Sequence, residues 1–205
     1  MYTPDAYAVT DAVEVERLLA ENPFACLVSH DGEGVFATHL PLLYDAERQV
    51  LTGHVARPNP QAGRGAGGQG LAIFNGPNAY ISPAWYPAKA EHGRVVPTWN
   101  YEAVHVHGTI AWREDPAWLR SHLTALVDRF EAPMREPWAL SDAPEDYVDK
   151  LLRGIVGFEL SIERTLAKRK LSQQRPQAEQ LSVIAALSAS ADPRDHAVAQ
   201  AMQRG

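Results

Sequence analysis

Apolar and polar residues alternate along several short stretches of the chain. The longest is VHVHGTIAW at 104–112, where apolar side chains take every second position and His105 and His107 share the other face. A period of two is typical of a strand with one buried face. The same pattern, bounded by turn residues, predicts further strands at 24–29, 35–44, 50–56, 71–75, 79–82 and 155–162.

Other stretches repeat their apolar residues at helical spacing. Asp11 is placed to cap a helix that ends before Asn22-Pro23, and a proline in the first turn favours a second helix. These signals predict helices at 11–21, at 116–130, from Ser141 or Asp142 to 152, and two in the tail, one opened by Pro176 and one from Asp192-Pro193 to near Arg204.

Most strands precede most helices along the chain. Hairpin-linked strands followed by helices favour an antiparallel sheet over a doubly wound parallel one. The predicted class is α+β with β dominant, built as a closed or nearly closed barrel with peripheral helices. We expect one domain over residues 1–175 and a helical extension over 176–205, whose apolar faces pack on the body or on a second subunit.

The net charge of −6 limits the partners of the chain. Attraction to nucleic acid or to an anionic membrane needs an extended positive field, which an acidic chain does not provide. The amino terminus lacks the pattern of a secretory signal, and no apolar run is long enough to cross a bilayer, so a cytoplasmic location is expected. The single cysteine, Cys26, lies in an apolar run and is interpreted as a core residue.

Two patterns that suggest ligands are rejected on their context. Gly63, Gly65 and Gly68 spell G-x-G-x-x-G, but that motif binds dinucleotides only between a strand and a helix, and here prolines precede it and LAIF follows. We interpret 63–70 as a flexible connector. His105 and His107 could share a metal ion, but no third ligand lies nearby in the sequence, so no metal site is expected.

A basic segment follows the last predicted strand. RTLAKRKLSQQR at 164–175 contains five cations and no carboxylate. Within it, Lys170, Ser172 and Gln173 combine an ammonium, a hydroxyl and an amide, which suit a phosphate monoester beside a heterocycle. His54, Arg57 and Asn59, in GHVARPNPQ at the end of a predicted strand, form a second such cluster. No hydrolytic motif is present, so any catalysis needs a cofactor to supply the chemistry.

Six stretches in one order resemble the PaiB-like family of FMN-binding negative transcriptional regulators. They are NPFACLVS, FATHLPLL, GHVARPNPQ, IFNGPNAYISPAWY, VPTWNYEAVHVHG and KRKLSQQR. The resemblance covers about Pro23 to Arg175. It implies a split β-barrel related to pyridoxamine phosphate oxidases and flavin reductases, usually a homodimer with FMN at the subunit interface.

The resemblance also implies which residues bind FMN, while catalytic residues stay unassigned. Thr38, His39 and Leu40 would lie on the strand that borders the flavin, and Arg57 and Asn59 would lie at the phosphate. Lys170, Ser172 and Gln173 would lie in the segment that closes over the cofactor. Trp99, Asn100 and His105 would lie near the ring or the partner subunit.

Several functions remain open at this point. The first is an FMN-binding regulator or flavin-based sensor, in which direct DNA binding has weak support because the cofactor claims the same basic residues. The second is a flavin-dependent oxidoreductase that acts on a small molecule. The third is a split-barrel haem-binding protein with a histidine as iron ligand, and the last is an interaction protein that has lost its cofactor.

Overall fold

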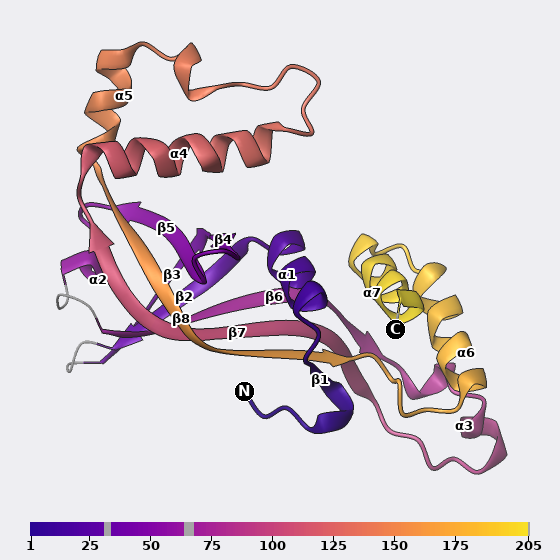
Figure 1. Cartoon of the computed structure of the whole chain (residues 1–205). Coiled ribbons are helices and arrows are strands. Elements are labelled where there is room, and N and C mark those ends of the chain that lie inside the picture. The colour runs from indigo at the N-terminus through magenta and orange to yellow at the C-terminus, as the bar shows by residue number, and fades with distance from the viewer. Residues whose placement is uncertain (31–33, 64–67, 205) are drawn as a thin grey trace. The chain divides into compact units, whose positions relative to one another are not determined.

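The computed structural model describes residues 1–30, 34–63 and 68–204 (Figure 1). The chain forms two compact units. The first unit comprises Met1–Asn22, Phe74–His105 and Leu166–Gly205, and the second comprises Pro23–Ile73 and Val106–Thr165. Strands β6 (Gln69–Ile81), β7 (Thr98–Arg113) and β8 (Ile155–Lys170) each contribute residues to both units. The predicted domain division after residue 175 concerns independent folding and stays a prediction.

The strands form one eight-stranded sheet in the order β3-β2-β6-β7-β8-β5-β4, and β1 pairs with β8. The pairs β1–β8, β2–β3, β2–β6, β4–β5 and β5–β8 are antiparallel. This confirms the predicted β-dominant α+β class, although the path of described strands ends at β3 and β4 without closing into a ring. The shorter strands are β1 (Ala8–Val9), β2 (Phe24–His30), β3 (Val35–Pro41), β4 (Leu43–Asp45) and β5 (Val50–Ala56).

In the second unit, β2 and β3 form the hairpin that the alternation predicted. Ala25 pairs with Leu40 in the core, and Cys26 pairs with His39 on the other face, since side chains of a strand alternate between faces. Cys26 is therefore half-buried rather than a core residue. The turn predicted at Asp31-Gly32 lies outside the described residues.

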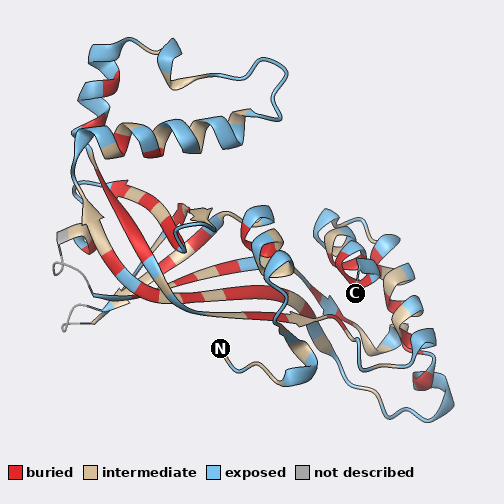
Figure 2. Ribbon diagram, viewed as in Figure 1, coloured by how far each residue is buried: buried red, intermediate tan, exposed pale blue. Residues whose placement is uncertain are grey.

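Two helices of the second unit pack on one another through a small apolar core. α4 (Pro116–Glu131) begins where the side chain of Asp115 accepts a hydrogen bond from the Trp118 amide at 2.8 Å. Leu119 of α4 lies in one buried cluster with Val148 and Leu152 of α5 (Glu145–Leu152). Figure 2 shows buried positions on both helices. The remaining short helices of this unit are α2 (Pro60–Gly63) and η3 (Leu140–Asp142).

In the first unit, the tail helices cover the ends of the long strands. α6 (Gln177–Ser188) and α7 (Pro193–Arg204) bury Val183 and Val198 in one cluster with Ile81 of β6. The predicted helix near the amino terminus is confirmed as α1 (Ala12–Glu21), with Asp11 accepting a hydrogen bond from the Glu14 amide at 3.0 Å. The remaining elements are η1 (Asp5–Tyr7), η2 (Pro83–Trp85) and α3 (Ala88–Glu91).

The long strands extend beyond their predicted bounds. β7 begins at Thr98 rather than 104, β8 continues to Lys170 rather than ending at 162, and β6 joins the two predicted runs 71–75 and 79–82. Pairing with distant strands overrides the local glycine, proline and charge signals. In the part of the chain that the structure describes, no helix combines the length and apolarity needed to span a membrane.

Candidate functional site

A pocket of 440 Å³ in the first unit gathers polar groups from the start of β7 and from the segment that follows β8. We call it the anion pocket. Its polar lining consists of Tyr7, Thr98, Asn100, Lys170, Ser172, Gln174 and Arg175. Two of these side chains are cations, and none of the described lining residues is a carboxylate. Such a set of donors suits an anion with several oxygens.

Lys170 stands at the last position of β8 and supplies the ammonium of this pocket. Its Nζ donates to Thr98 Oγ1 at 2.5 Å and to the Trp99 carbonyl oxygen at 2.7 Å. Both acceptors are neutral, so they leave the positive charge uncompensated. Burial, with the nearby charges of Lys168 and Arg175, lowers the pKa of Lys170 below its ordinary value. An anion in the pocket would reverse this effect, because it favours the charged form.

Arg175 is the second cation of the anion pocket, but it already has a partner. Its Nη1 lies 3.1 Å from Glu179 Oε2, and its guanidinium lies 4.4 Å from the centre of the Tyr86 ring. Glu179 and Tyr86 are both buried. These contacts fix the orientation of Arg175 and partly neutralise its charge, so Lys170 is the stronger candidate for an anion ligand.

Ser172 has a backbone conformation that is unusual for a residue with a side chain. Its φ is 64°, in the left-handed region that costs free energy for residues other than glycine. The hydroxyl donates to Asn100 Oδ1 at 3.1 Å, and Asn100 is 1% exposed. Asn100 Nδ2 in turn lies 3.4 Å from Met202 Sδ. The strained backbone thus holds the Ser172 hydroxyl beside a buried amide at the anion pocket.

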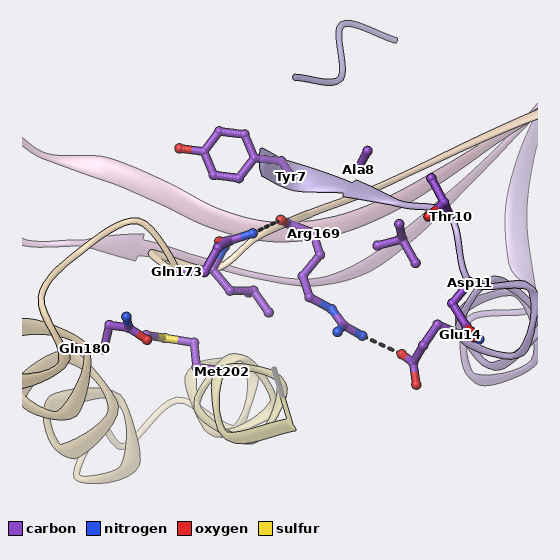
Figure 3. Close-up of a pocket in the computed structure, with 11 residues that line it drawn as sticks. Tyr7, Ala8, Thr10, Asp11, Glu14, Arg169, Gln173, Gln180 and Met202 are labelled. Carbon is purple, nitrogen blue, oxygen red and sulfur yellow. Dashed lines mark hydrogen bonds and ion pairs between the residues drawn. The ribbon is translucent and has the colours of Figure 1, made fainter. Parts of the chain in front are cut away.

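Gln173 has a structural role in the folded chain. Its Oε1 accepts from the Leu171 amide at 2.8 Å, and its Nε2 donates to the carbonyl oxygens of Arg169 at 2.7 Å and Ala6 at 3.1 Å. Figure 3 shows Gln173 at a neighbouring pocket, where Arg169 reaches Glu14. Gln174, rather than Gln173, lines the anion pocket.

The second unit brings together another group of predicted site residues. Asn59 Nδ2 donates to Thr38 Oγ1 at 3.0 Å, and Asn59 Oδ1 accepts from the Gln61 amide at 2.9 Å. Gln61 is 1% exposed, and its Nε2 donates to Ser29 Oγ at 2.9 Å. The Oε1 of Gln61 has no hydrogen-bond partner among the described residues. This cluster therefore has a rigid polar base that retains an unused acceptor.

Arg57 is close to Asn59 in sequence, but its guanidinium is committed to other contacts. It donates to the carbonyl oxygens of Arg153 at 2.8 Å and Ile155 at 3.1 Å, and to Glu114 Oε2 at 2.7 Å. All three nitrogen atoms of the side chain are used in these bonds. The geometry thus favours a role for Arg57 in joining chain segments over the predicted role in binding a phosphate.

The other predicted residues differ in how accessible they are. Leu40 is 4% exposed and lies in the core, whereas His39 is exposed with its ring 6.3 Å from that of Phe24. Trp99 is 54% exposed, and its ring meets Tyr80 edge to face at 6.2 Å. His105 is half-buried on β7.

The site residues predicted from the sequence did not include Thr98 or Arg175. Thr98 stands two positions before Asn100, so a strand beginning at 98 would have placed both on one face. Within residues 1–30, 34–63 and 68–204, no group of three or more histidine, cysteine, aspartate or glutamate side chains is arranged to hold a metal ion. Of the G-x-G-x-x-G glycines, Gly65 lies outside the described residues.

Known proteins resemble this chain in sequence over most of its length. A family model described as "Putative FMN-binding domain" matches residues 1–164. The "Protease synthase and sporulation protein PAI 2" of Bacillus subtilis is 34% identical over 99% of this chain and 97% of its own length.

Solved structures share the fold at low sequence identity. The FAD and haem binding protein of Mycobacterium smegmatis gives a TM-score of 0.61 at 16% identity, covering 86% of this chain and 79% of that one. The flavocytochrome Anf3 of Azotobacter vinelandii gives 0.58 at 14% identity, covering 80% and 69%. The sheet is thus of the split-barrel type found in flavin-binding proteins, and the chain belongs to the FMN-binding domain family that the matching model describes.

Proposed function

We propose that this chain is a PaiB-type FMN-binding regulator whose anion pocket holds the FMN phosphate. The observation that carries this proposal is Lys170, an ammonium with neutral partners in a pocket whose described lining contains no carboxylate. A phosphate monoester carries close to two negative charges at neutral pH and accepts several hydrogen bonds. It would supply the negative charge that the folded chain does not offer Lys170.

The other donors of the pocket fit the same group. Thr98 provides a hydroxyl and Arg175 a guanidinium already oriented by Glu179, while Ser172 and Asn100 bond to one another and form part of the pocket wall. FMN, when bound, supplies the electron-transfer and hydride-transfer chemistry that no side chain provides. The task of these residues is to bind and orient the phosphate end.

The polar edge and the ring of FMN need separate contacts. Thr38, His39 and Asn59 are our candidates for hydrogen bonds to the polar edge, and the exposed Trp99 is our candidate for stacking. These roles rest on the family resemblance and on the exposure of His39 and Trp99. Leu40 would contribute through its backbone, because its side chain is in the core.

We also propose that the active form is a homodimer. Strand β3 is an edge of the sheet in the second unit. Val35 at its start is 72% exposed, and Phe24 of β2, which pairs with Pro41 at the other end of β3, is 65% exposed. An unpaired edge with exposed apolar side chains favours association with another chain. Sedimentation velocity over a range of concentrations tests this, and a monomer at all concentrations would contradict it.

Regulation through direct contact of the basic segment with DNA is not favoured by the contacts of its side chains. Lys168 is 7% exposed and donates to the Tyr2 carbonyl oxygen at 3.1 Å. Arg169 pairs with Glu102 at 2.8 Å and with Glu14. We therefore propose that the regulatory output passes through flavin-dependent contacts with another molecule, and DNA binding measured at several salt concentrations tests this proposal.

The decisive experiment compares FMN with riboflavin, which lacks the phosphate. We expect Lys170→Ala to weaken FMN binding about tenfold or more, as removal of one charge-assisted contact does, while riboflavin affinity stays the same. Lys170→Arg should restore part of the loss. Binding is followed by quenching of flavin fluorescence in titrations of the full chain.

Arg57→Ala and Arg164→Ala are the matched controls, since each removes one positive charge outside the anion pocket. Both variants are expected to bind FMN with an affinity within about twofold of that of the parent protein if only charges inside the anion pocket affect binding. An equal loss for FMN and riboflavin in Lys170→Ala would mean that Lys170 does not contact the phosphate. Full FMN affinity in that variant would remove the basis of the proposal.

A further inference from the structure

The chain contains four lysines, and they differ sharply in their surroundings. Lys89 of α3 and Lys150 of α5 are exposed, and Lys168 is 7% exposed. Lys170 is half-buried and lines the anion pocket. Because all four carry the same amine, differences in their reactivity report on the surroundings of each one.

Lys168 is a lysine that the fold encloses. Its Nζ donates to the Tyr2 carbonyl oxygen at 3.1 Å and lies 5.7, 5.8 and 5.3 Å from the ring centres of Tyr2, Tyr7 and Tyr101. Aromatic faces attract a cation, so the three rings hold this ammonium in place. An enclosed amine is out of reach of a reagent in the solvent.

Lys170 lies two positions further along β8, and its surroundings favour an uncharged amine. Its Nζ donates to two neutral oxygens, Thr98 Oγ1 at 2.5 Å and the Trp99 carbonyl oxygen at 2.7 Å. Burial lowers its pKa, and the charges of Lys168 and Arg175 lower it further. The neutral amine is the nucleophilic form of lysine, and partial burial beside other cations increases its population. Lys170 is therefore the best placed of the four lysines to attack an electrophile.

The anion pocket determines which electrophile comes close to this amine. Its second cation, Arg175, is oriented by Glu179 Oε2 at 3.1 Å, and none of its described lining residues is a carboxylate. A phosphate group is therefore favoured in the pocket over a neutral or cationic group. The volume of 440 Å³ is in the range that holds whole small molecules, so an acyl group joined to that phosphate has room.

We propose that Lys170 is a modification site, which acyl phosphates acylate while their phosphate group lies in the anion pocket. The amine attacks the acyl carbon, so a C–N bond forms and the bond from the acyl carbon to the bridging oxygen breaks. Starting from the ammonium, nitrogen loses two protons. One goes to the departing phosphate, which leaves as hydrogen phosphate, and the other goes to the solvent. The product is an uncharged amide, and nothing is oxidised or reduced.

Two effects of the pocket on this reaction oppose one another. A bound anion favours the ammonium form of Lys170, which is not nucleophilic. Proximity acts in the other direction, because an amine held beside an electrophile reacts as if it were highly concentrated. Lys89 and Lys150 meet an acyl phosphate from the solvent with neither effect. Faster acylation at Lys170 than at these exposed lysines therefore requires guidance by the pocket.

Acylation would also remove the charge that the FMN phosphate needs. This consequence rests on the proposed function, whereas the acylation itself needs only the pocket. An acylated chain should bind FMN about tenfold or more weakly, as expected for the loss of one charge-assisted contact.

The probe is acetyl phosphate, added to the full chain without FMN. Acetylation of each lysine is followed over time by mass spectrometry of chymotryptic peptides, with fragmentation to separate Lys168 from Lys170. We expect Lys170 to react at least about fivefold faster than Lys89 and Lys150 because the pocket holds the reagent beside it. Inorganic phosphate should slow the reaction at Lys170 and leave the two exposed lysines unchanged. With p-nitrophenyl acetate, which carries no phosphate, the preference for Lys170 should fall at least about threefold.

Variants of single lysines serve as controls. Lys170→Arg keeps the charge but removes the amine, so the fast phase of acetyl incorporation should disappear. Lys89→Arg and Lys150→Arg change exposed residues outside the pocket and should leave the rate at Lys170 unchanged. Equal rates at Lys170, Lys89 and Lys150 would overturn the proposal. So would a fast phase that persists in Lys170→Arg, an equal preference with p-nitrophenyl acetate, or no slowing by inorganic phosphate.

Addition of FMN tests the link to the proposed function separately. FMN should protect Lys170 from acetylation, and riboflavin, which lacks the phosphate, should not. Protection by inorganic phosphate without protection by FMN would contradict the FMN assignment and still support acylation at Lys170.

Discussion

Acid should destabilise this protein in a pH window set by His122. The residue is 6% exposed, and burial, with a smaller repulsion from His54, lowers its pKa from 6.5 to about 4. In the unfolded chain the same imidazole takes up its proton near pH 6.5. Between these two values the unfolded state binds more protons, so the free energy of unfolding falls as the pH is lowered through 6.5 and stops falling below about 4.

The size of this effect follows from the two pKa values. A difference of about 2.5 pH units corresponds to about 3 kcal/mol when the window is crossed completely. From about pH 7.5 to about pH 4.5 the expected loss from His122 is about 2.5 kcal/mol, because most of the folded form is still unprotonated at the lower pH. Above about pH 7 the group contributes no pH dependence.

Urea unfolding at several pH values between about 7.5 and 4.5 measures this loss. The reference is His122→Phe, which keeps a ring against Trp118 but cannot be protonated. Burial also lowers the pKa of His54, so some acid sensitivity remains in the variant, and the difference between the two proteins isolates His122. His92→Phe, an exposed control, should follow the parent. Parallel pH curves for the parent and His122→Phe would refute the reasoning.

Three further predictions follow from the packing. Glu102→Ala removes a carboxylate that is 2% exposed and leaves Arg169 with Glu14 alone. Chemical unfolding should therefore show that the free energy of unfolding falls by about 3 kcal/mol. A fall below about 1 kcal/mol would mean that the Glu102–Arg169 pair does not behave as a buried ion pair. Ser172→Gly removes the strain of the left-handed backbone conformation, because glycine adopts it at little cost. This variant should be about 1 kcal/mol more stable than Ser172→Ala, which lacks the same hydroxyl but keeps a Cβ. Equal stabilities of the two variants would argue against strain at this position. Gly157→Ala must displace the Trp118 indole, so the free energy of unfolding should fall by about 1–3 kcal/mol and the near-ultraviolet circular dichroism should change. An unchanged spectrum would show that the indole accommodates the added methyl group without moving.

The alternating pattern predicted most strands because it reflects burial on one face, which is a local property. The predicted strand 50–56 agrees with β5, and Asp11 caps α1 as its side chain suggested. The same logic failed where exposure depends on tertiary neighbours. The helical spacing of apolar residues in 11–21 places Val13 with Leu18 and Leu19, yet Val13 is 72% exposed while the two leucines are buried.

The candidate site was only partly predictable for a related reason. The sequence indicated Lys170 and Ser172 through their chemistry, but it could not show that the Gln173 amide would bond to the backbone or that all three nitrogens of Arg57 would be used within the fold. The acceptors of these hydrogen bonds include atoms far away in the chain, such as the carbonyl oxygen of Ala6, which is 167 residues from Gln173. His122 gave no motif at all, because its importance comes from burial and from its neighbour His54.

The contacts of the basic segment explain how an acidic chain keeps a cluster of cations and leaves one of them, Lys170, without a carboxylate partner among the described residues. Lys168 lies 5.3 Å from the centre of the Tyr101 ring and donates to a backbone oxygen, and Arg169 is neutralised by two carboxylates. These contacts hold the end of β8 in place. Lys170, the next residue, meets only neutral oxygens in the described part of the chain. The end of the strand therefore uses Lys168 and Arg169 for stability and directs Lys170 into the anion pocket, where a bound phosphate would complete its electrostatic environment.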